Sequence, residues 1–120
     1  MTLAVEVDSL AQRFELALGA DRIIADPTLA APFGTDATHL SGLPALVIQP
    51  RSTAEVATAV RIAAERRVPL IPRGAGTNLS GGVIPSDGGG DVVLDMATLS
   101  GPVEVDVDNM VATAKPGVIT

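Results

Sequence analysis

The residues with the clearest chemical potential form one glycine-rich stretch, residues 73–82, which reads Arg-Gly-Ala-Gly-Thr-Asn-Leu-Ser-Gly-Gly. Glycine has no Cβ, so the backbone can turn sharply and direct successive N–H groups at one ligand, and such a concave nest suits phosphate oxygens. Side-chain donors are available at Arg73, Thr77, Asn78 and Ser80. The stretch therefore predicts a phosphate or pyrophosphate cradle, with a plain turn between two strands as the alternative.

Two well-known phosphate-binding loops match this stretch poorly. A Walker loop ends in Gly-Lys-Ser/Thr, and residues 73–82 contain no lysine. The dinucleotide fingerprint G-x-G-x-x-G would place its third glycine at Leu79, and Pro85 with a second glycine cluster follows where that fold has a helix. ATP hydrolysis and a Rossmann-type nicotinamide site are therefore disfavoured.

Short apolar runs and capping signals predict the elements that position the stretch. Strands are expected at residues 45–48, 68–71 and 92–95, because each run is too short for a helix. Between the first two, Ser52 and Glu55 form a capping-box pattern that begins a helix, which ends before Pro69. This strand, helix and strand lead directly into residue 73.

The flanking segments carry weaker signals. A helix over residues 10–18 is predicted to begin at a cap on Ser9 and to end at Gly19, and the Pro- and Gly-rich residues 25–44 predict irregular structure. Residues 103–108 alternate valine with acidic residues before a turn at Asn109. That alternation predicts a half-buried hairpin over residues 103–115, with its acidic face in water.

Composition excludes several classes of protein. The 120 residues carry 8 basic and 14 acidic side chains, a net charge of −6, so a basic surface for nucleic acid is not expected. The chain has no cysteine, which excludes disulfides and thiolate metal sites, and its single histidine, His39, is expected in an exposed loop. No apolar run approaches the ~20 residues of a membrane span. A single soluble, cytoplasmic domain without a metal is expected.

The order of these motifs resembles the FAD-linked oxidase family that includes glycolate oxidases and D-lactate dehydrogenases. The resemblance rests on Ile-Gln-Pro-Arg-Ser-Thr-Ala-Glu-Val at 48–56, on residues 69–82, and on later segments at 92–95, 103–106 and 114–118. It implies an α+β fold of the PCMH-type FAD-binding class, present only in part. Residues 43–120 would be the N-terminal portion of that domain, and residues 1–42 a helical and irregular lead-in.

The resemblance also implies a site. Backbone amides of the glycine-rich stretch would hold the FAD pyrophosphate, and a Pro-Gly turn near the end of the chain would approach the cofactor. The implied cofactor-binding residues are Arg73, Gly74, Ala75, Gly76, Thr77, Asn78, Ser80, Gly81, Gly82, Pro116 and Gly117. No histidine lies in the stretch, so noncovalent FAD is expected. The family also has a carboxylate at the place of Asp36, which an Asx turn would explain equally well.

In function, the resemblance implies a flavin-dependent oxidoreductase that oxidises a small 2-hydroxy acid by hydride transfer to FAD. Family members continue through the rest of the flavin domain and a cap that supplies catalytic groups, so these 120 residues are not expected to turn over alone. Unpaired strand edges would favour self-association. The alternative is a noncatalytic domain that binds a nucleotide or a protein partner, or a degenerate remnant of a flavoenzyme.

Overall fold

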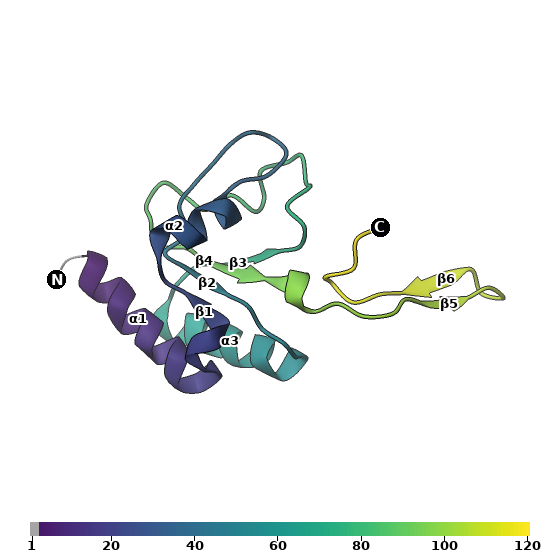
Figure 1. Cartoon of the computed structure of the whole chain (residues 1–120), viewed down its shortest axis with the longest axis horizontal. Coiled ribbons are helices and arrows are strands. Elements are labelled where there is room, and N and C mark those ends of the chain that lie inside the picture. Colours follow the sequence, from purple (N-terminus) through teal and green to yellow (C-terminus); the bar gives the residue numbers. More distant parts are fainter. Residues whose placement is uncertain (1–2) are drawn as a thin grey trace.

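The computed structural model describes residues 3–120, which form a body of helices packed on a sheet and a projecting two-stranded hairpin (Figure 1). The main elements are α1 (Leu3–Leu18), β1 (Ile23–Ile24), α2 (Pro27–Ala30), β2 (Leu46–Ile48), α3 (Thr53–Arg66), β3 (Leu70–Arg73), β4 (Val92–Asp95), β5 (Glu104–Asp106) and β6 (Val111–Thr113). Short 3-10 turns lie at Ala20–Arg22, Ala31–Gly34 and Met96–Thr98. Within residues 3–120, no helix is both long enough and apolar enough to cross a membrane.

The body is built on a four-stranded sheet with the order β1-β2-β4-β3. The strands β2, β4 and β3 are parallel, and β1 pairs antiparallel with β2. β4 therefore lies between the two strands that the sequence joins through α3. All three parallel strands end at the same edge of the sheet, and the crevice beyond such an edge is where ligands bind in open α/β sheets.

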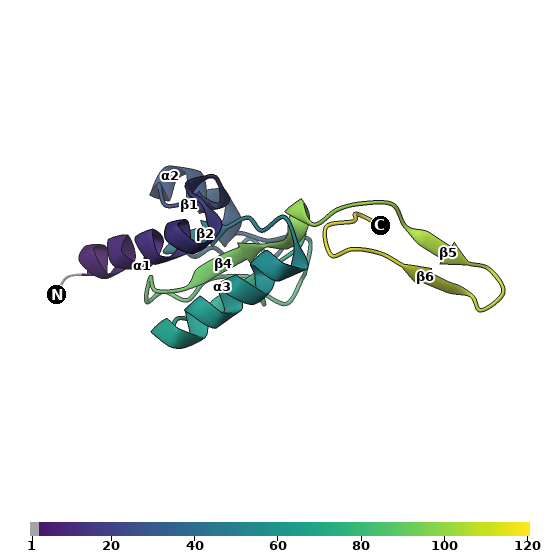
Figure 2. The same cartoon turned by 90° about the horizontal axis from the view of Figure 1, so that it is seen from below.

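Helices cover both faces of the sheet, with α1 and α3 on one side and α2 on the other (Figures 1 and 2). Phe14 of α1 and Ile62 of α3 pack against Leu46 of β2, whereas Ala30 of α2 packs against Val47 of the same strand. Because β2 and β4 are buried on both faces, they appear in the sequence as continuous apolar runs. The predicted strands at 45–48 and 92–95 are confirmed.

The helix predicted after Ser52 is confirmed as α3. The Ser52 hydroxyl accepts a hydrogen bond from the backbone N–H of Glu55 at 3.2 Å, which caps the first turn. The Glu55 carboxylate reaches back to the backbone N–H of Arg51 at 2.6 Å and also pairs with Arg22 at 3.0 Å. This ion pair ties the turn after α1 to the start of α3.

Two predictions in the first half of the chain were wrong. α1 begins at Leu3, so Ser9 lies inside the helix and does not cap it. The helix extends because no breaker lies between residues 3 and 9 and because Val7 adds a turn to the apolar stripe that packs on the core. The segment expected to be irregular contains α2, whose cap is Asp26; its carboxylate accepts from the Thr28 N–H at 2.8 Å.

The hairpin β5–β6 has the predicted alternation but not the predicted burial. Val105 pairs with Ala112 in register, and cross-strand partners share a face. Val105 is nevertheless 68% exposed and Val107 77% exposed. The reason is geometric, because the hairpin extends away from the sheet and no other part of residues 3–120 covers its valine face (Figure 2).

Candidate functional site

The glycine-rich loop, residues 74–82, leaves the sheet at the carboxyl end of β3. Arg73, the last residue of β3, is in register with Asp95, the last residue of β4. Asp95 is 5% exposed and accepts hydrogen bonds from Gln49 Nε2 at 3.0 Å and from the Ala97 N–H at 3.1 Å. This buried carboxylate therefore lies at the carboxyl ends of the strands, and the loop begins next to it.

The backbone of the loop is a row of unused donors. No N–H between Gly74 and Gly82 donates to another group within residues 3–120, and the next one along the chain to do so belongs to Ile84, which donates to the Gly81 carbonyl at 3.1 Å. Most of these residues are exposed, so their N–H groups are free to meet a ligand without first breaking a hydrogen bond inside the protein. A run of amides without a partner, on a loop at the carboxyl edge of a sheet, has the donor chemistry that a phosphate group requires.

Gly76 and Arg73 are packed against each other. Gly76 has a φ of +71°, and a Cβ built on it would lie 2.6 Å from Cζ of Arg73 and closer still to Nη2. Arg73 has little freedom to withdraw, because its Nη1 donates to the carbonyls of Phe33, at 3.4 Å, and of Thr35. The arginine predicted as a phosphate donor thus uses one end of its guanidinium to hold the lead-in segment.

Asn78 is held from the same side. Its Nδ2 donates to Oδ2 of Asp36 at 2.8 Å, while Oδ1 of Asp36 accepts from the backbone N–H of Thr38 at 2.8 Å and from the Thr38 hydroxyl. The hydrogen bond from the Thr38 hydroxyl, aided by the Thr38 N–H and Asn78, lowers the pKa of Asp36. Asp36 therefore forms the Asx turn considered from the sequence and contacts the glycine-rich loop as well.

The Pro-Gly turn near the end of the chain lies beside the start of the loop. The Pro116 carbonyl oxygen is 3.8 Å from where a Cβ of Gly74 would be. Gly117 donates its N–H to the Leu99 carbonyl at 2.8 Å, and a Cβ there would lie 2.8 Å from the carbonyl carbon of Ala97. The return of the chain from the hairpin to the sheet edge thus depends on a close backbone approach at Gly117.

The other predicted site residues lie on the open side of the loop. The exposed ones are Ala75, Thr77, Ser80 and Gly82, and a Cβ added to Gly82 would meet nothing within 4 Å. Gly81 is partly buried beside Leu40, whose Cδ1 is 3.8 Å from the Cβ position. The loop therefore has an anchored side, at Arg73 and Asn78, and an open side.

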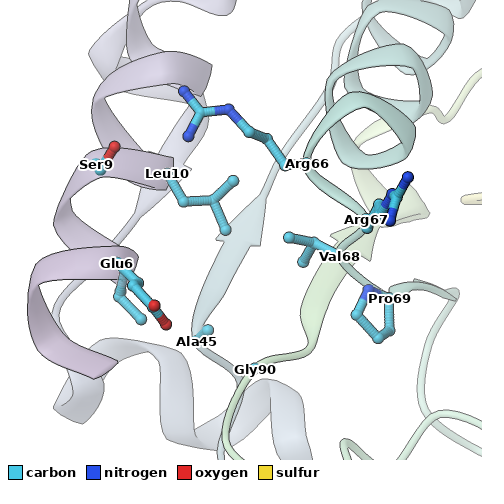
Figure 3. A pocket seen from close by; sticks show the side chains of 10 residues that line it. Glu6, Ser9, Leu10, Ala45, Arg66, Arg67, Val68, Pro69 and Gly90 are labelled. Carbon is cyan, nitrogen blue, oxygen red and sulfur yellow. The ribbon is translucent and has the colours of Figure 1, made fainter. Parts of the chain in front are cut away.

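Pockets lie at both ends of the parallel strands. One of about 500 Å³, lined by Arg51, Ser52, Thr53, Val56, Met96, Leu99, Lys115 and Pro116, shares Pro116 with the site. Another, of about 560 Å³, lies between α1 and the end of α3 (Figure 3). Its lining includes Ala45, Pro69 and Gly90, which precede β2, β3 and β4, so it is at the edge of the sheet opposite the loop.

Sequence reasoning missed the contacts that fix the loop. The acceptors for Arg73 are the backbone carbonyls of Phe33 and Thr35. Every residue has a backbone carbonyl, so the sequence does not show which ones will accept. The Asp36 to Asn78 contact had a partial signal, since the sequence already indicated a carboxylate of interest at residue 36. Its partner, 42 residues further along the chain, depends on the fold.

Comparison with known proteins identifies the family. Residues 44–120 match a family model described as FAD binding domain. The chain belongs to this FAD-binding family, as the resemblance predicted. FAD is accordingly its cofactor. The unused amides of residues 74–82, with a glycine at 76 where no side chain fits, suit the pyrophosphate of that molecule.

The sequence relatives include proteins named as oxidases and dehydrogenases, and they are longer than this chain. The glycolate oxidase subunit GlcD of Bacillus subtilis is 44% identical over 89 residues, covering 73% of this chain and 18% of the relative. The D-lactate dehydrogenase of Archaeoglobus fulgidus is 38% identical over 73 residues, covering 61% and 16%. A probable mitochondrial D-lactate dehydrogenase of Danio rerio is 29% identical over 113 residues, covering 93% and 22%. The chain therefore spans about a fifth of the length of these relatives.

Solved structures confirm the fold. A 4-ethylphenol oxidase from Gulosibacter chungangensis superposes with a TM-score of 0.79 at 26% identity, covering 96% of this chain and 23% of that one. A p-cresol methylhydroxylase superposes with a TM-score of 0.77 at 21% identity, covering 98% and 23%. The predicted α+β fold of the PCMH-type FAD-binding class is thereby confirmed.

Proposed function

We propose that residues 73–82 and the Pro116-Gly117 turn hold the pyrophosphate of noncovalently bound FAD in a flavin-dependent oxidoreductase. The observation that carries the proposal is the row of backbone N–H groups from Gly74 to Gly82 that have no partner within residues 3–120. Amides already held in place bind an anion with little reorganisation, and Arg73 and Asn78 fix the loop from behind.

The residues of the site divide into binding and positioning groups. Backbone amides of the loop would contact phosphate oxygens, while Arg73 and Asn78 keep the loop in register with the sheet edge. The bound flavin supplies the hydride acceptor. A noncovalent complex is supported by the absence of histidine from residues 73–82, since His39 lies exposed in the lead-in segment.

We also propose the substrate class and the domain boundaries. The relatives named glycolate oxidase and D-lactate dehydrogenase support a small 2-hydroxy acid as substrate. Residues 43–120 would form part of the FAD-binding domain, and residues 1–42 would be a lead-in whose end braces the loop. A noncatalytic nucleotide-binding domain would share the cradle, so FAD binding alone does not separate the two; reduction of the bound flavin by substrate does.

FAD binding is tested by titrating the purified chain into FAD and following flavin fluorescence, then by gel filtration with detection of the visible flavin band. The chain has no Trp or Tyr, so protein fluorescence does not interfere. We expect saturable binding and co-elution. A folded chain that leaves FAD fluorescence unchanged at high micromolar concentration and elutes without the flavin band would refute the proposal.

The substrate class is tested in a longer protein that carries this chain, loaded with FAD and kept anaerobic. Addition of glycolate or D-lactate is expected to bleach the visible flavin band, and a 4-alkylphenol is the comparison compound. Bleaching by the phenol alone would refute the 2-hydroxy acid assignment. Bleaching by none of them in a protein that binds FAD would favour the noncatalytic alternative.

Self-association through the hairpin is a separate proposal. Val103, Val105 and Val107 are 44%, 68% and 77% exposed, on an element with free strand edges. Exposed apolar strands readily pair with a second chain. We propose that a second copy covers this valine face, with the acidic side chains of Glu104 and Asp106 facing water.

A further inference from the structure

The last part of the lead-in segment, residues 33–42, is a closed loop that contacts the glycine-rich loop. It is closed by a bridge between Thr35 and Ser41 and by the Gly42 N–H, which donates to the Gly34 carbonyl at 2.9 Å. It is also pinned to the sheet edge, because Nη1 of Arg73 donates to the Phe33 and Thr35 carbonyls. These hydrogen bonds therefore hold residues 33–42 in a defined conformation beside the glycine-rich loop.

Asp36 is where this segment meets the loop through a side chain. Both of its carboxylate oxygens are used: Oδ1 accepts from the Thr38 N–H and hydroxyl, and Oδ2 accepts from Nδ2 of Asn78 at 2.8 Å. Thr38 thus fixes the direction of the carboxylate, and the carboxylate fixes Asn78. Leu40 also lies near the loop at this point, with its Cδ1 3.8 Å from where a Cβ of Gly81 would be.

The negative charge of Asp36 allows two possible roles of this residue in FAD binding to be told apart. A carboxylate beside a site for an anion opposes binding by Coulomb repulsion. If Asp36 served only as a surface charge, its removal would strengthen FAD binding or leave it unchanged. If Asp36 positions the loop, the loss of its hydrogen bonds would weaken FAD binding despite the removal of the negative charge. Only the positioning role therefore predicts weaker FAD binding when Asp36 is removed.

We infer that Asp36 is a positioning residue for the cofactor, holding Asn78 so that the amides of residues 77–82 face the pyrophosphate. The inference rests on the proposed function of the loop. Asp36 acts through Asn78 and need not contact FAD. Without it, the second half of the loop would lose the side-chain hydrogen bond that ties it to the lead-in segment, and fewer molecules would present the binding conformation at any moment.

Two substitutions separate the hydrogen bonds from the charge. Asp36→Ala removes both, whereas Asp36→Asn removes the charge only: its Oδ1 still accepts from Thr38, and its Nδ2 can donate to Asn78 once the Asn78 amide turns over. We expect Asp36→Ala to raise the Kd for FAD about five- to tenfold, the scale of one net hydrogen bond. Asp36→Asn should keep the Kd of the unaltered chain or lower it.

The matched control is Asp87→Ala, which makes the same change in net charge in an exposed turn outside the loop. It should leave the Kd unchanged. Backbone NMR order parameters of the chain without FAD are the second readout. Asp36→Ala should lower the order parameters of residues 77–82 and leave those of β4 and α3 as they were, a pattern that general destabilisation would not produce.

The inference is overturned if Asp36→Ala binds FAD as tightly as the unaltered chain, or if Asp36→Asn binds as weakly as Asp36→Ala. Should Asp36→Ala not fold, Asn78→Ala decides, because it removes the same contact and keeps the Asx turn; unchanged FAD affinity would then refute the inference. An unaltered chain that does not bind FAD would refute the proposed function and this inference with it. An unaltered chain that binds FAD, with a higher Kd for Asp36→Ala than for Asp36→Asn, is thus the result that supports both.

Discussion

Gly76→Ala is the most direct perturbation of the proposed cradle. Gly76 has a φ of +71°, and its missing side chain leaves the space that the Arg73 guanidinium occupies, with Cζ 2.6 Å and Nη1 3.1 Å from the Cβ position. An added methyl group has no room unless Arg73 moves. Arg73 cannot move without loss of its hydrogen bonds to the Phe33 and Thr35 carbonyls. The substitution therefore acts on the backbone and on the anchor together.

The expected cost is the sum of two contributions. A left-handed backbone costs an L-residue with a Cβ about 1–2 kcal/mol. Loss of the hydrogen bonds from a charged donor costs about 1.5–3 kcal/mol, reduced here because Arg73 is only partly buried and can be rehydrated. A total of about 2–4 kcal/mol in favour of other loop conformations lowers the population that can bind, and the Kd for FAD should rise by about 30-fold to several hundred-fold.

Fluorescence titration with FAD measures this effect, and Gly90→Ala is the matched control. Gly90 lies outside the loop, has no positive φ, and a Cβ there meets nothing within 4 Å. Gly76→Ala should still fold around the same core, because Gly76 and Arg73 belong to neither cluster of core residues. An unchanged FAD affinity in a folded Gly76→Ala chain would refute the assignment of the cradle.

Four further outcomes are expected. Ser52→Ala should lower the free energy of unfolding by about 1 kcal/mol in urea titration, since it removes the cap of α3, and leave FAD affinity unchanged. Arg22 lowers the pKa of Glu55 below its usual 4.5, so the stability it provides is complete above about pH 4.5 and is lost as the pH falls through the lowered pKa; Glu55→Gln should flatten that decline in acid unfolding curves. Val105→Lys should shift the chain toward the monomer in sedimentation velocity, and an unaltered chain that is already monomeric at millimolar concentration would contradict self-association. FAD affinity should depend weakly on salt, because amide dipoles release no counterions; a steep loss of affinity between low and high salt would instead point to side-chain cations.

The predictable parts of the fold are those whose structure leaves a clear pattern in their own residues. β2 and β4 are buried on both faces, so each shows an apolar run, and α3 carries its own cap at Ser52. Elements whose bounds depend on a tertiary contact, or that are very short, were harder to predict. The start of α1 depends on Val7 packing against the core, and β1 is two residues long, too short for any period to appear.

The hairpin shows the limit of pattern reasoning most plainly. Its alternation of valine and acidic residues is real, and the strands pair as expected. Alternation reports that two faces differ in polarity, but it does not say what covers the apolar one. Val105 is two-thirds exposed because the strands leave the body, and the direction in which a strand leaves is set by the turn at Met96–Thr98 and the return at Gly117.

In the site, too, some features could be predicted from the residues and others depended on the fold. A sharp turn in the glycine-rich stretch was predictable because glycine reports on the backbone itself, and Gly76 has a φ of +71°. The acceptors of Arg73 were not predictable, because residue type shows that a side chain can donate and not which acceptor it will meet. In the fold, the carbonyls of Phe33 and Thr35 accept from its Nη1.

An acidic chain that binds an acidic cofactor requires local chemistry to outweigh net charge. The chain carries −6, and some of its cations are already paired: Arg13 with Glu65, and Arg22 with Glu55 and Asp21. Arg66 and Arg67 line the pocket at the far edge of the sheet. In the proposed site, backbone amides would resolve the difficulty, because they offer the positive ends of dipoles and add no charge that Asp36 or Asp95 could neutralise. Glycine and loop geometry would then supply what lysine and arginine supply elsewhere, and a nearby acidic residue such as Asp36 could position the loop without cancelling a cation needed for binding.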